Sequence, residues 1–291
     1  MMSTTSPPDS LRWFRFTVGL IATGVAALSV HAIMLQVWGV PFPDLSVIPA
    51  PFKLLVRMVA TLALIVFWQL ASPSVQGSFV KRWGVLFLIS AMLNESLVRG
   101  PFMEGYCTTA WVFAFVGNLS KLASIAVVAA LVVAATPRLI LVWQKVTAAA
   151  VIAAFGMYVA TPLIAMAMGP VMESIASLAP QSEWCTLPYG PNVLIPAYLT
   201  FAEPVLACVA AAALIWDRLA PSRALRFLQF ALLILALKNQ LLMPFIYAAF
   251  AKVPLVDAFV SESQFALEAI ALALLSGVTW AWSRPESKRV A

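Results

Sequence analysis

The sequence predicts an all-α membrane protein made of two similar halves. Hydrophobic residues make up 63% of the 291 residues and charged residues only 10%, whereas about a quarter of a typical soluble domain is charged. Several apolar stretches reach the ~20 residues that a helix needs to cross a bilayer. Short peptides of the first half recur in the same order in the second half, as in membrane proteins built from internal repeats.

Eight apolar stretches, separated by prolines, glycines and charged residues, are expected to cross the membrane. The first follows Arg12 and Arg15 and is too long for the apolar core of a cleaved signal peptide, so we expect it to be retained. The longest polar connection is of loop size, which leaves no room for a soluble domain. In chain order the expected helices are Phe14–Trp38, Phe52–Ala71, Trp83–Val98, Trp111–Ala135, Leu139–Met166, Val193–Trp216, Leu225–Phe250 and Gln264–Trp282.

Prolines are expected to interrupt or end three of these helices near one membrane surface. Pro204 removes a backbone donor within the sixth helix, while Pro101 and Pro244 should end or kink the third and seventh. Carbonyl groups freed in this way need protein or water as partners inside a membrane. The proline-rich segments 41–51 and 188–196 are expected to cover the same surface.

Basic residues alternate between the two sides of the predicted bundle. The positive-inside rule places the basic side, and with it both termini, in the cytoplasm. The opposite loops are mainly acidic and would face a periplasm, so we expect a bacterial inner-membrane protein. The basic side holds Arg12, Arg15, Lys81, Arg82, Arg138, Lys145, Arg218, Arg223, Arg226, Arg284, Lys288 and Arg289.

Four pairs of short peptides indicate the repeat. They divide the chain into residues 1–137 and 138–291, each with four helices. An even number of helices in each repeat makes the halves parallel, related by a pseudo-twofold axis along the membrane normal. The alternative is that alanine- and leucine-rich segments match by chance. The pairs are Pro41–Ala50 with Pro188–Ala197, Trp68–Ser74 with Trp216–Ser222, Pro101-Phe102 with Pro244-Phe245, and Ala114–Val116 with Ala258–Val260.

The cysteines fit an oxidising outer face. Cys107 and Cys185 lie in outward-facing segments of different halves, where a disulfide can persist. We therefore predict a Cys107–Cys185 bridge between the halves. Two unrelated thiols beyond bridging distance are the alternative. Cys208, within the sixth helix, is expected to be a small core residue.

Polar and ionisable residues within the apolar helices form the candidate binding site. A charge at this depth costs several kcal/mol unless it is paired or faces water or protein. Both signs occur at similar depth, which favours a polar cavity between the halves that opens outward. The alternative is interhelical pairing that only fixes packing, as the favourable four-residue spacing of Glu95 and Arg99 would allow. The set comprises Arg57, Asn94, Glu95, Arg99, Asn118, Lys121, Glu203, Lys238, Asn239, Gln240, Gln264 and Glu268.

No motif in the sequence indicates a metal site, a cofactor or nucleic-acid binding. The chain has one histidine, His31, which we interpret as a packing residue, and it lacks nucleotide-binding and redox-cysteine motifs. We expect a transporter, or a protein that handles lipids or small anions, with membrane lipids as partners. A non-catalytic subunit that docks a periplasmic or membrane protein is the first alternative. A membrane-embedded enzyme acting on a lipid or quinol at the outer leaflet is the second.

Overall fold

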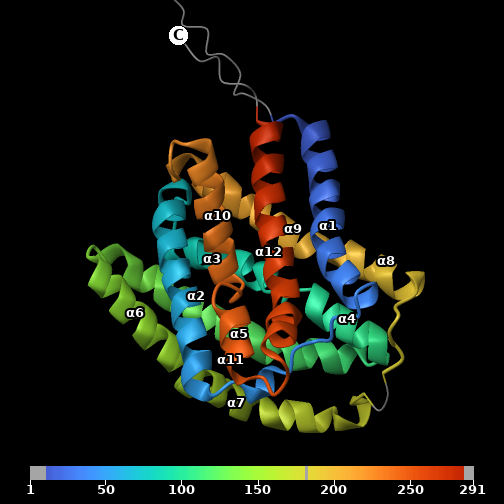
Figure 1. Ribbon diagram of the computed structural model, residues 1–291. Coiled ribbons are helices and arrows are strands. Elements are labelled where there is room, and N and C mark those ends of the chain that lie inside the picture. Colours follow the sequence, from blue (N-terminus) through green and yellow to red (C-terminus); the bar gives the residue numbers. More distant parts are fainter. Residues whose placement is uncertain (1–10, 181–182, 285–291) are drawn as a thin grey trace, which may run out of the picture.

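The computed structural model describes residues 11–180 and 183–284, and every regular element in these ranges is helical (Figure 1). Six helical stretches are long and apolar enough to cross a membrane, which indicates a multi-pass membrane protein. These stretches are Trp13–Gln36, Ala50–Ser74, Trp111–Arg138, Val142–Ser174, Pro191–Arg218 and Leu255–Ser283.

Four of the six stretches are built around a single uninterrupted α-helix: α1 (Trp13–Gln36), α2 (Ala50–Ala71), α5 (Trp111–Ala135) and α12 (Leu255–Ser283). The other two are composite. α6 (Val142–Phe155) continues through a π-helical turn, Gly156–Ala160, into α7 (Thr161–Ser174). α8 (Pro191–Thr200) meets α9 (Ala202–Ile215) at Phe201.

The third and seventh expected helices are each broken in two. α3 (Phe79–Leu93) is followed by α4 (Arg99–Thr108), and α10 (Arg223–Leu237) by α11 (Met243–Phe250). The residues between them, 94–98 and 238–242, form turns. α3 and α10 therefore end earlier than the positions of Pro101 and Pro244 suggested.

Pro101 and Pro244 lie in the first turn of the second, shorter helix of each pair. The missing N–H of proline costs little there, because the first N–H groups of a helix have no intrahelical partner. The two prolines thus begin helices instead of ending them, which corrects the expectation from the sequence.

Several helix boundaries recur along the chain at a constant interval. α3 begins at residue 79 and α10 at residue 223, and the two helices end at residues 93 and 237, so both ends differ by a step of 144 residues. The same step takes the first residue of α5 to that of α12, and the last residue of α2 to that of α9. We call two residues equivalent when they are separated by this step.

Only one of the four peptide pairs lies in this register. Ala114–Val116 and Ala258–Val260 are equivalent, whereas Pro101 is equivalent to Phe245 and Trp68 to Ala212. The other three pairs are therefore offset from this register by between one and four residues.

The first and last described segments meet at one end of the bundle. α1 runs alongside α12 (Figure 1), and the backbone N–H of Arg12 donates to the carbonyl of Ser283 at 2.9 Å. Arg284 pairs with Asp217 at 2.6 Å at this end. At the opposite end, Ser261 Oγ donates to the carbonyl of Pro41 at 2.8 Å.

Candidate functional site

The two helix breaks have the same backbone conformation. Glu95 and its equivalent, Asn239, both adopt positive φ, at 52° and 63°. The next residue of each break donates its backbone N–H back into the preceding helix, from Ser96 to Ala91 at 2.9 Å and from Gln240 to Leu235 at 2.7 Å. Asparagine tolerates this left-handed conformation, but glutamate adopts it only where the surroundings impose it. The contacts of Glu95 supply that constraint.

The two breaks also touch each other through reciprocal contacts. Asn94 Nδ2 lies 3.5 Å from the carbonyl oxygen of Leu237, and Lys238 Nζ lies 3.2 Å from that of Leu93. Asn94 and Lys238 are equivalent, as are Leu93 and Leu237, so each contact is the counterpart of the other. A pseudo-twofold axis between the breaks would produce this pattern.

A compact group of charges surrounds this contact. Glu95 accepts hydrogen bonds from Arg99 Nε and Lys238 Nζ, both at 2.6 Å. Glu268 Oε1 lies 3.9 Å from the same lysine nitrogen. The side chains are largely buried, at 7–25% exposure. Buried charges of this kind are tolerated because each has an opposite charge close by.

Glu203 completes the charged group by capping a helix. Its carboxylate accepts the backbone N–H groups of Leu97 at 2.9 Å, Val98 at 2.9 Å and Arg99 at 2.5 Å. These donors precede or begin α4 and have no intrahelical acceptor. The residue equivalent to Glu203 is Val59, so no carboxylate occupies the corresponding position beside α11.

Arg99 connects the charged group to α8. Its Nη1 donates to the carbonyl of Ala197 at 2.5 Å and to Thr200 Oγ1 at 3.1 Å, and its guanidinium lies 5.0 Å from the ring centre of Phe201. Arg99 is therefore held between both halves of the chain.

Beside Arg99 lies a cavity of about 480 Å³ between α1, α4 and α8. This is within the range that holds a drug-sized ligand. Leu28, Leu35 and Val193 contribute apolar wall, while Glu104 and Glu183 add carboxylates. The cavity lies between residues of the first and the second half.

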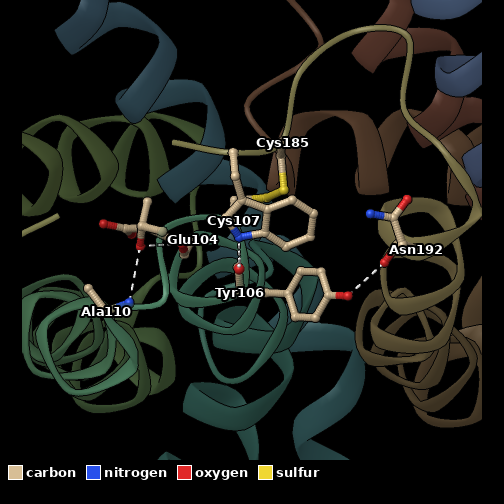
Figure 2. The surroundings of a disulfide bond; sticks show 8 residues. Glu104, Tyr106, Cys107, Ala110, Cys185 and Asn192 are labelled. Atoms are coloured by element: carbon tan, nitrogen blue, oxygen red, sulfur yellow. Dashed lines mark hydrogen bonds between the residues drawn. A yellow bond between two sulfur atoms is a disulfide. The ribbon is translucent and has the colours of Figure 1, made fainter. Parts of the chain in front are cut away.

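A disulfide bond lies at the edge of the cavity, where Cys107 is one of the lining residues (Figure 2). The predicted pair, Cys107 and Cys185, is bonded, with 5.2 Å between the Cα atoms. Trp184 Nε1 donates to the carbonyl of Tyr106 at 2.8 Å, and the Tyr106 hydroxyl donates to that of Asn192 at 2.8 Å. The segment before α8 is thus fixed to α4.

The structure brings together most of the predicted binding residues. Asn94, Glu95, Arg99, Glu203, Lys238, Asn239 and Glu268 meet where the helix breaks touch, and Gln240 lies in the second break. Asn118 donates to the carbonyl of Ser96, and Lys121 to that of Asn94 at 3.3 Å.

Two predicted residues lie elsewhere. Gln264 donates to the carbonyls of Pro41 at 3.1 Å and Ser261 at 2.7 Å and so holds the loop that follows α1. Arg57 is exposed on α2. Within residues 11–180 and 183–284, Arg99 is the one member of the predicted set that lines the cavity. The charged group and the cavity, which were expected to coincide, are therefore neighbours that share one side chain.

Several cavity residues were not predicted. The His31 ring packs against both Phe42 and Phe265, with ring centres 5.5 and 4.9 Å away. Tyr198, whose hydroxyl lies 2.8 Å from Ser29 Oγ, and Tyr189 also line the cavity. Each is an isolated polar or aromatic residue in its own segment, so no local pattern marked them.

Burial, assisted by the nearby carboxylate of Glu183, raises the pKa of Tyr189. Its hydroxyl therefore remains protonated at neutral pH and can donate a hydrogen bond at the cavity wall. Among the described residues, no group of three histidine, cysteine or acidic side chains is placed to hold a metal ion. A comparison of the chain with family models, with curated proteins and with solved structures finds no match.

Proposed function

We propose that the chain is an eight-crossing membrane protein of two duplicated, parallel halves, residues 1–137 and 138–291, that binds and transports a lipid-like ligand in the cavity between them. The broken pairs α3–α4 and α10–α11 would be the two crossings beyond the six long stretches. α3 and α4 contain 15 and 10 residues, enough at ~1.5 Å per residue to cross the ~30 Å hydrocarbon core.

The proposed orientation places both termini in the cytoplasm and the disulfide in a periplasm. It is supported by the basic residues Arg12, Arg218 and Arg284 at the end where the first and last described segments meet. The disulfide at the other end fits an oxidising compartment. A bacterial inner membrane has this arrangement.

The observation that carries the proposed function is the cavity of about 480 Å³ that reaches Arg99. Its apolar walls suit an acyl or isoprenoid chain. Arg99 is already paired with Glu95, so it offers the ligand a hydrogen-bond donor with little net charge. This favours an amphiphile with a carbonyl, ester or carboxylate oxygen.

Transport is supported by the position of the helix breaks. Discontinuous helices at the interface of two repeats commonly form the binding site of membrane transporters. Here the breaks lie at the contact between halves, and Arg99 connects them to the cavity. A relative movement of the halves would therefore change the position of Arg99 at the cavity wall.

Binding can be tested with a dansyl-labelled fatty acid and the purified protein. Ala32 lines the cavity, and Ala32→Trp should fill part of it and weaken binding at least tenfold. Ala165→Trp, at an exposed position of α7, is the matched control and should bind as the wild type does. Equal binding by both variants would contradict the proposal.

A docking role is a second candidate, favoured by one observation. Trp184 is 41% exposed although its segment is fixed by the disulfide and by the hydrogen bond to Tyr106. A rigid, exposed tryptophan is a typical anchor of a protein interface. Co-purification of a stoichiometric partner that is lost with Trp184→Ala, but retained with Ala32→Trp, would favour this function.

A further inference from the structure

Arg57 and Lys121 are exposed cationic side chains on two long apolar helices. Arg57 lies two turns into α2, and Lys121 lies ten residues into α5. Neither is within salt-bridge distance of a carboxylate among the described residues. A charge at membrane depth is costly unless it is paired or reaches water. Neither cation therefore has a carboxylate in direct contact, although Lys121 lies within electrostatic reach of Glu95 and Glu203, so both leave room for an anionic partner from outside the chain.

The two side chains belong to one location. α2 packs against α5, and Arg57 is within electrostatic reach of Lys121. Lys121 Nζ also donates to the carbonyl of Asn94 at 3.3 Å, beside the first helix break. One turn further along α5, Ser124 Oγ lies 3.2 Å from Thr161 Oγ1 of α7. The location is thus bounded by α2, α5 and α7.

The equivalent location in the other half has a different chemistry. The residues equivalent to Arg57 and Lys121 are Phe201 and Phe265. Phe201 lies under Arg99, and Phe265 packs on His31 at the edge of the cavity. One side of the bundle therefore carries an aromatic environment where the other carries two positive charges. A second, anionic ligand would account for this difference.

We propose that Arg57 and Lys121 bind the phosphate of an anionic phospholipid that is seated between α2, α5 and α7. A guanidinium donates two parallel hydrogen bonds to a phosphate, and an ammonium adds a compact charge. Both side chains are long enough to extend their charged ends towards a lipid headgroup. Exposed apolar residues on the same helices, such as Leu55 and Leu163, can contact the acyl chains. Soluble phosphate would leave this apolar surface uncovered.

The site can be tested by native mass spectrometry of the full chain in detergent, titrated with phosphatidylglycerol or phosphatidylcholine. Wild-type protein should bind phosphatidylglycerol more tightly. Arg57→Gln and Lys121→Gln should each weaken that binding about fivefold, and the double variant about thirtyfold, as expected for ~1 kcal/mol per cation. Lys81→Gln, which changes an exposed lysine at the other end of the bundle, should leave it unchanged.

Three outcomes would overturn the proposal: equal binding of the two lipids, a double variant that keeps the wild-type preference, or full competition by millimolar inorganic phosphate. The last would assign the site to a soluble anion. Arg57→Lys with Lys121→Arg retains both charges and should retain the preference, which separates loss of charge from misfolding. Ala32→Trp should not change phosphatidylglycerol binding here, so failure of the cavity proposal would remain distinguishable.

Discussion

Replacing Glu203 tests whether the first helix break depends on its carboxylate. In the wild type this group accepts three backbone N–H donors, at 2.9, 2.9 and 2.5 Å, and the residue is 7% exposed. Glu203→Ala leaves these donors without an acceptor in a largely dry location. We expect α4 to lose its fixed start and the segment from Leu97 to Arg99 to become mobile.

The magnitude follows from the number and type of hydrogen bonds. A hydrogen bond to a charged group contributes about 1.5–3 kcal/mol, and loss of an ordinary helix cap costs about 0.5–2 kcal/mol. Water entering beside α4 would replace part of the loss. We therefore expect Glu203→Ala to lower the free energy of opening by about 3 kcal/mol. Glu203→Gln keeps one acceptor oxygen and should cost about 1.5 kcal/mol.

Cys208 provides the assay. It is the one free cysteine of the described chain, it is fully buried, and it belongs to α9 together with Glu203. Its alkylation by a maleimide requires opening of the helix packing. When closing is faster than alkylation, the rate follows the opening equilibrium. At about 1.4 kcal/mol per tenfold change, we expect a rate increase of roughly 150-fold for Glu203→Ala and roughly tenfold for Glu203→Gln.

Glu173→Ala serves as the control, because this glutamate is exposed near the end of α7. Its alkylation rate should equal that of the wild type. The reasoning would be refuted if Glu203→Ala also reacted within threefold of the wild-type rate. In that case the three short contacts would contribute nothing net to the stability of the break.

Two further predictions concern the charged group and the disulfide. Lys238→Met should lower the free energy of opening by about 3 kcal/mol, because it leaves Glu95 and Glu268 without their shared cation. Adding Glu95→Gln should recover part of this loss. The same alkylation assay, run as a double-mutant cycle, would show no coupling if the pair were unimportant. The double variant Cys107→Ser with Cys185→Ser removes a link between residues separated by 78 positions and should lower stability by about 4 kcal/mol; an unchanged thermal midpoint in non-reducing detergent would contradict this.

The sequence was sufficient for the class of fold and for the membrane helices that are continuous. Apolar length alone locates α1, α2 and α5, since each is long and interrupted by few charges. It locates α12 only in part: the expected helix begins at Gln264, whereas α12 begins nine residues earlier, at Leu255. It could not locate the breaks at 94–98 and 238–242. Both combine polar with apolar residues and contain neither glycine nor proline, so no local signal marks them. Their conformation depends on contacts with the other half of the chain.

The charged residues were predicted as a group because the free-energy cost of placing a charge within a membrane helix does not depend on the detailed packing around it. Their separation from the cavity could not be predicted, since the cavity is formed by α1, α4 and α8, which are distant in the sequence. The Cys107–Cys185 bond, by contrast, follows from the order of the helices, because both cysteines fall in segments that the sequence assigns to the same side of the bundle.

Placing charges at a pseudo-twofold axis has a physical consequence for a duplicated chain. In a symmetric pair, equivalent residues near the axis are identical, so a charge there faces its own copy and is repelled. Ser74 and Arg218 are equivalent and in direct contact at 2.6 Å; two arginines would be unfavourable there, whereas arginine with serine forms a hydrogen bond. The same holds at the breaks, where Lys238 has Asn94 as its equivalent. Under the proposed duplication, the two halves of one chain can diverge independently, and this makes an ion pair across the axis possible.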